Sequence, residues 1–108
     1  MTPGPPLSVA PLQPAGCAKA LSAVDTYYQT AGTTRYTQKA AARQAAEDLW
    51  NTTTSLRGNG PFSAMSALYR DFSNLRMILE GYSGQDYSAA QAQTNADAQT
   101  LRRVCGVS

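Results

Sequence analysis

Residues 63–82 read SAMSALYRDFSNLRMILEGY, and large apolar side chains recur in this stretch at intervals of three and four residues. The recurring positions are Met65, Leu68, Phe72, Leu75, Leu79 and Tyr82. This spacing matches the 3.6-residue turn of an α-helix, so the six side chains share one face. The stretch therefore predicts an amphipathic helix that buries this face against other helices.

Three further segments show helical spacing. The first runs from Cys17 to a stop at Gly32, the second covers 34–56, and the last covers 87–105. The face predicted for the first contains Cys17, Leu21, Val24, Tyr28 and Ala31. Short connections join the segments and none of them alternates like a strand, so we expect an all-α, small up-down-up-down four-helix bundle. A three-helix bundle with the last segment loosely appended is the alternative, because the face of that segment is small and polar.

The N-terminal stretch MTPGPPLSVAPLQPAG contains five of the six prolines in the chain. Proline fixes φ and lacks an amide donor, so neither a helix nor a central strand is expected there. We interpret 1–16 as a proline-rich linker or tail and 17–108 as the helical bundle domain. Such a stretch is typical of the connection between a membrane anchor or signal peptide and an extracytoplasmic domain, and equally of an ordinary chain terminus.

Cys17 and Cys105 are the two cysteines of the chain. An up-down-up-down bundle brings them to the same end, so we predict a disulfide that closes the fold and favours an oxidising compartment. We therefore expect an extracytoplasmic protein, secreted or at the cell surface, with its signal or anchor upstream. The alternative is lipidation, because PAGC at 14–17 resembles the end of a bacterial lipobox, in which the cysteine carries a lipid.

Several classes of function are disfavoured by composition. A net charge of +2 with 15% charged residues gives no dense basic surface for nucleic acid. The absence of histidine removes histidine-dependent triads and imidazole metal ligands. No apolar run is long enough to span a membrane in this chain. Seven arginines against two lysines are typical of a GC-rich bacterial genome. We expect no enzyme activity, no cofactor and no metal.

Two weaker signals remain open. Asp25 and Asp97 lie near the predicted core faces of two helices, where a converging carboxylate pair would be an acid–base catalyst. Arg35, Lys39 and Arg43 form a basic stripe, which is either a solvated helix face or a contact for an acidic partner or anionic envelope polymer. We interpret Met65 and Met77 as core residues rather than haem or copper ligands.

Five of the six tyrosines fall at the end of the predicted bundle opposite the cysteines, which we call the tyrosine pole. Three of them, Tyr28, Tyr82 and Tyr87, occupy face positions and are expected to close the core with their hydroxyls in water. Tyr27 and Tyr36 have no such position. The residues predicted to bind a partner there are Tyr27, Tyr28, Arg35, Tyr36, Tyr82, Asp86 and Tyr87.

Tyrosine beside arginine is enriched in binding hot spots. The sequence therefore predicts a non-catalytic extracytoplasmic module for binding, sensing or cell-envelope interaction, with an unknown protein or envelope ligand as its partner. The alternatives are a small enzyme that uses bundle carboxylates, a structural spacer, and an oligomerisation domain. The tyrosines would then only cap the core.

Overall fold

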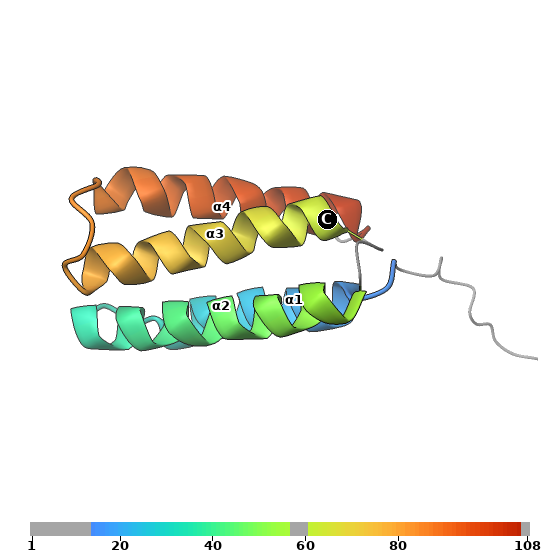
Figure 1. Ribbon diagram of the computed structural model, residues 1–108, viewed down its shortest axis with the longest axis horizontal. Helices are drawn as coiled ribbons and strands as arrows, with labels where there is room; N and C mark the ends of the chain where they lie inside the picture. The colour runs from blue at the N-terminus through green and yellow to red at the C-terminus, as the bar shows by residue number, and fades with distance from the viewer. Residues whose placement is uncertain (1–13, 57–60, 107–108) are drawn as a thin grey trace, which may run out of the picture.

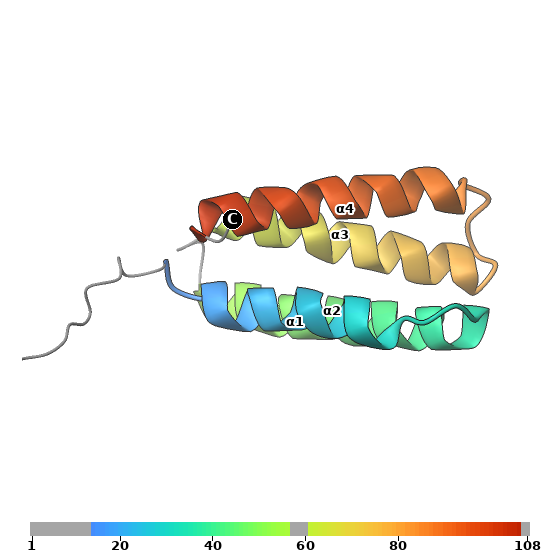
Figure 2. The ribbon, with the colours of Figure 1, turned by 180° about the vertical axis from the view of Figure 1, so that it is seen from behind.

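The computed structural model describes residues 14–56 and 61–106 and confirms the all-α bundle. Its helices are α1 (Cys17–Thr30), α2 (Arg35–Leu56), α3 (Phe62–Leu79) and α4 (Tyr87–Val104). Each helix runs antiparallel to the one before it, with α1 and α2 in one layer and α3 and α4 in the other (Figures 1 and 2). The two described ranges contain no strand, and residues 1–13 of the proline-rich segment lie outside them.

The face of α3 predicted from the sequence forms the centre of the core. Met65, Leu68, Phe72 and Leu75 are fully buried. Tyr82 was predicted on the same face, and this prediction is wrong because the helix ends at Leu79.

Gly81 stops α3 by adopting the left-handed conformation, with φ of 86°. The amides of Gly81 and Tyr82 donate back to the carbonyls of Ile78 and Met77, which closes the last turn. The chain therefore turns away from the core before Tyr82, and this side chain is 78% exposed.

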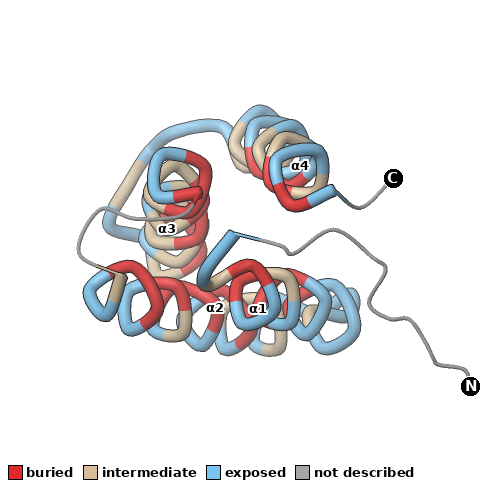
Figure 3. The backbone as a smooth tube through the Cα atoms, turned by 90° about the vertical axis from the view of Figure 1, so that its right-hand side faces the viewer, coloured by how far each residue is buried: buried red, intermediate tan, exposed pale blue. Residues whose placement is uncertain are grey.

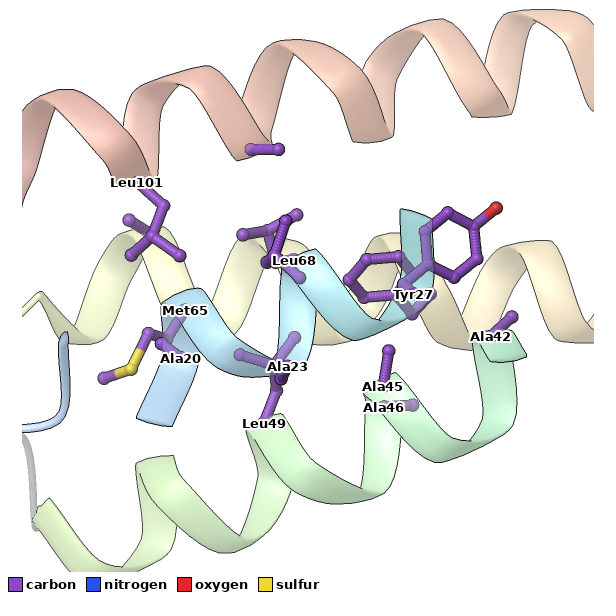
Figure 4. Packing of buried hydrophobic residues seen from close by; sticks show 14 of the residues in the cluster. Ala20, Ala23, Tyr27, Ala42, Ala45, Ala46, Leu49, Met65, Leu68 and Leu101 are labelled. Atoms are coloured by element: carbon purple, nitrogen blue, oxygen red, sulfur yellow. The ribbon is translucent and has the colours of Figure 1, made fainter. Parts of the chain in front are cut away.

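The buried face of α2 is made mostly of alanine. Ala42, Ala45 and Ala46 lie in the core with Leu49, and all four point toward the side chains of the other helices (Figure 4). Small side chains let the two backbones approach closely, and α2 and α3 form the most extensive helix pair of the bundle. The large residues that fill the space come from α3.

The buried face of α1 is rotated from the predicted one. The core positions are Cys17, Ala20, Val24 and Tyr27, whereas Tyr28 is 43% exposed. The two alternatives share Cys17 and Val24, so spacing alone does not separate them. Tyr27 takes the buried position because its ring packs on Phe72, with ring centroids 4.7 Å apart.

The helix α4 completes the bundle, with Thr94, Ala98 and Leu101 buried on its inner face (Figure 3). It packs mainly on α3 and makes only a few contacts with α1. The predicted disulfide joins Cys17 to Cys105, with Cα atoms 5.8 Å apart. This pairing leaves Cys17 no thiol for a lipid. Within the described residues no helix is long and apolar enough to cross a membrane.

Candidate binding site

The residues of the tyrosine pole separate into two groups. Tyr27, Tyr28 and Tyr87 line an open cleft of about 430 Å³ at the end of α1, together with Gln91 and Asn95 of α4. We call this the tyrosine cleft. Tyr36 and Tyr82 are 76% and 78% exposed and do not line it. The predicted pole is therefore a cleft on one side of the bundle with two exposed rings elsewhere.

Tyr27 forms the floor of the cleft and is only 3% exposed. Its hydroxyl donates to Gln91 Oε1 at 2.9 Å, and its ring meets that of Tyr28 edge-on with centroids 5.1 Å apart. Burial raises the pKa of Tyr27, so its hydroxyl stays protonated at neutral pH. The expectation that Tyr27 lacks a place in the core was wrong, because the true register of α1 puts it there.

Side-chain amides connect the tyrosines across the cleft. The hydroxyl of Tyr28 donates to Asn95 Oδ1, and the hydroxyl of Tyr87 donates to Gln91 Oε1 at 3.3 Å. Gln91 in turn donates to Asn95 Oδ1 at 3.0 Å. Both amide oxygens are therefore occupied. Among the described residues the amide nitrogen of Asn95 has no hydrogen-bond partner, so it is available as a donor to a ligand.

Two charged residues predicted to bind a partner make contacts within the bundle, and their predicted role in binding stays a prediction. Arg35 donates from Nε to the carbonyl of Leu79 at 2.8 Å, which joins the start of α2 to the end of α3. Asp86 caps α4 by accepting a hydrogen bond from the Ala89 amide at 2.9 Å. The contact of Arg35 also interrupts the basic stripe predicted on α2. Neither residue lines the tyrosine cleft.

Asp25 and Asp97, considered as an alternative catalytic pair, have separate partners in the structure. Asp25 accepts from Arg102 Nη2 at 2.9 Å in an ion pair between α1 and α4. Asp97 instead interacts with Asp71 of α3. Burial, a hydrogen bond with Asp97 and repulsion by its charge raise the pKa of Asp71 to about 7.

The sequence indicates that Asp71 lies beside the buried face of α3, but Asp71 was not among the predicted site residues. It lies three residues after Leu68 and four before Leu75, so it flanks the buried face of α3. Its Oδ2 atom is buried and has no hydrogen-bond partner among the described residues. A buried carboxyl oxygen without a donor is costly as an anion, which is why the protonated form is favoured.

A second surface, also missed from the sequence, lies between α2 and α3. The rings of Trp50 and Tyr69 pack with centroids 5.3 Å apart. They line both a hollow of about 480 Å³ toward Met77 and one of about 180 Å³ beside Phe62. We call these two hollows the aromatic groove. Met77 was expected in the core, but it is 42% exposed.

The comparisons with known proteins give no match, whether against protein-family models, curated proteins or solved structures. Among the described residues no group of three or more acidic or cysteine side chains is placed to hold a metal ion. The function has therefore to be argued from the cleft, the groove and the disulfide.

Proposed function

We propose that this protein is a non-catalytic binding module outside the cytoplasm and that the tyrosine cleft holds its ligand. The observation that carries the proposal is the cleft itself, in which three tyrosine rings and two side-chain amides meet at the junction of α1 and α4. Tyrosine provides a large contact area at a small entropic cost, and amides provide adaptable hydrogen bonds. The disulfide supports a location in an oxidising compartment.

The chemistry of the cleft favours a neutral ligand. None of the described residues that line it carries a charge. The exposed face of Tyr28 suits a flat apolar surface, and the free donor of Asn95 suits a carbonyl or hydroxyl oxygen. These features support a neutral protein segment or envelope ligand rather than an acidic polymer.

The test compares two exposed tyrosines. Tyr28→Ala removes a wall of the cleft, whereas Tyr36→Ala removes an exposed ring outside it. The probes are neutral oligosaccharides and uncharged peptides, and binding is followed by chemical-shift changes of Gln91 and Asn95. We expect the Tyr28 variant to lose binding by about tenfold or more and the Tyr36 variant to retain it. Equal effects of the two substitutions would contradict the proposal.

The pKa of Asp71 supports a second candidate, an acid–base enzyme that uses Asp71 and Asp97. A carboxyl group that titrates near neutral pH is suited to proton transfer. Against this, neither carboxyl group lines the tyrosine cleft or the aromatic groove. Mass spectrometry of a bound probe after incubation at pH 5 to 8 separates the two functions, because a binding module returns it unchanged. Turnover that is lost in Asp97→Asn would establish the enzyme instead.

A further inference from the structure

The aromatic groove exposes an apolar surface that the bundle itself leaves uncovered. Trp50 is 52% exposed, Phe62 39% and Met77 42%. Because Trp50 and Tyr69 line both hollows, their rings form a ridge between two depressions. Exposed aromatic and apolar side chains that gather at one groove are a candidate place for another segment to pack.

The polar atoms of the ridge suit one kind of occupant. Among the described residues, neither the indole N–H of Trp50 nor the hydroxyl of Tyr69 has a hydrogen-bond partner. Grooves walled by aromatic rings with free donors bind proline-rich segments, because proline rings pack between the aromatic rings while the peptide carbonyls accept hydrogen bonds. Such a segment is already extended in solution, so binding costs it little conformational entropy.

The chain contains a segment with this chemistry. Residues 3–12 read PGPPLSVAPL, with four prolines and no charged side chain. Leu7, Val9 and Leu12 supply further apolar groups for the two hollows. An uncharged, apolar sequence of this kind matches the rings of Trp50 and Tyr69, while the larger hollow is also lined by Arg43, Glu47 and Arg76.

This segment joins α1 at the end of the bundle where the groove opens. A Cβ atom added to Gly16 would come 2.6 Å from Leu56 Cδ1, so the chain enters α1 against the last turn of α2. Thr53, one turn before Leu56, lines the smaller hollow with Phe62. The start of α1, the end of α2 and the start of α3 all lie at this end of the molecule (Figure 1).

The length of the segment is sufficient. The ten residues 3–12 would span about 31 Å in a polyproline conformation. The part of α3 that lines the groove, from Phe62 to Met77, is about 22 Å long at 1.5 Å per residue. The segment is therefore long enough to follow the groove, and residue 13 connects it to Pro14 at the start of the described chain.

We propose that residues 3–12 bind in the aromatic groove between α2 and α3 of the same chain. The covalent connection gives the segment a millimolar effective concentration, so even a weak interaction fills the groove. The groove is then a peptide site occupied by the protein's own sequence, separate from the tyrosine cleft.

The experiment uses Trp50, the only tryptophan in the chain, as the reporter. Acrylamide quenching of its fluorescence is measured in the full chain, in the double variant Pro5→Ser/Pro6→Ser, and in the control Pro14→Ser. Pro14 lies outside the docking segment, so its substitution should leave quenching unchanged. We expect the double variant to be quenched about twofold faster, because the exposed half of the indole loses its cover.

A peptide of residues 1–14, added to the double variant, should restore protection of Trp50. The same peptide should have no effect on the wild-type chain, whose groove is filled. Equal quenching of wild type and double variant would overturn the proposal. Protection that disappears on dilution would overturn it as well, because the segment would then come from a second copy. Circular dichroism checks that all variants keep their helical content.

Discussion

Two helix pairs of the bundle, α2 with α3 and α1 with α4, are held together by different kinds of contact. Between α2 and α3 the contact is apolar, with alanines on one helix and large side chains on the other, and the helices approach closely. Between α1 and α4 the helices make few contacts, and individual bonds connect them. These bonds are the disulfide, the ion pair of Asp25 with Arg102, and the hydrogen bonds of Tyr27 and Tyr28 with the amides of α4.

The difference explains where a ligand site can form. A ligand cannot enter between the packed faces of α2 and α3 because separating them would expose core surface, so the aromatic groove can take a segment only on the outside of this pair. An interface held by polar side chains can exchange some of its hydrogen bonds for bonds to a ligand at a small net cost. The tyrosine cleft lies on the α1–α4 side, at the end far from the disulfide.

The largest expected effect is the loss of the disulfide. The bond joins positions 88 residues apart, and closing a loop of this length stabilises by about 4 to 5 kcal/mol in the chain-entropy model. Cys17→Ser/Cys105→Ser should lower the free energy of unfolding by up to this amount in urea denaturation. Hydrogen exchange should speed up first in α1 and α4, because few other contacts join them. Uniform acceleration across all four helices would show that the two sides are not independent.

Leu49→Ala tests the apolar side. Leu49 is fully buried on α2, and its truncation should cost about 3 kcal/mol through lost burial and the cavity left behind. The matched control is Leu21→Ala on α1, where the side chain is only partly buried and the cost should stay below about 1 kcal/mol. Denaturant midpoints give both values. Similar costs at the two positions would mean that the apolar contact is not concentrated between α2 and α3.

The sequence predicted the number, order and direction of the helices because each apolar face repeats at helical spacing. It did not predict the face of α1, because two registers share Cys17 and Val24. The choice between them depends on the fit of Tyr27 against Phe72, which is a property of packing and not of spacing. The disulfide was predictable from topology alone, since antiparallel helices return the chain to its starting end.

The candidate sites were less predictable because they depend on pairs of helices. The sequence placed Tyr28 and Tyr87 at one end, but their convergence with Gln91 follows from the rotation of α1 and α4. Trp50 and Tyr69 lie on the flanks of neighbouring helices, and nothing in either pattern indicates that their rings meet. Asp71 was overlooked in favour of Asp25, whose actual partner is a cation.

The smallest expected effect concerns the third interface, between α3 and α4, where Asp71 interacts with Asp97. Arg70 is the nearby cation that opposes the shift, and the charges of Asp71 and Tyr28 also influence each other. Because the folded-state pKa of Asp71 is raised from 3.8 to about 7, the folded protein binds a proton that the unfolded chain has released between these pH values. The stability due to this proton is complete below pH about 4 and is lost as pH rises through about 7.

Asp71→Asn removes the ionisation while keeping the shape of the side chain. The variant should be about 1 kcal/mol more stable than wild type at pH 8 and no more stable at pH 4. The value at pH 8 is set below the one that the full pKa shift would give, because the carboxyl group is partly exposed to solvent. Urea denaturation at the two pH values measures this. Asp25→Asn is the control, and its expected effect on stability is opposite. It removes the ion pair with Arg102 and should therefore lower stability slightly at pH 8. If the effect of Asp71→Asn did not change with pH, the stability of the α3–α4 interface would not depend on the charge of Asp71, and this interface would resemble the apolar α2–α3 pair.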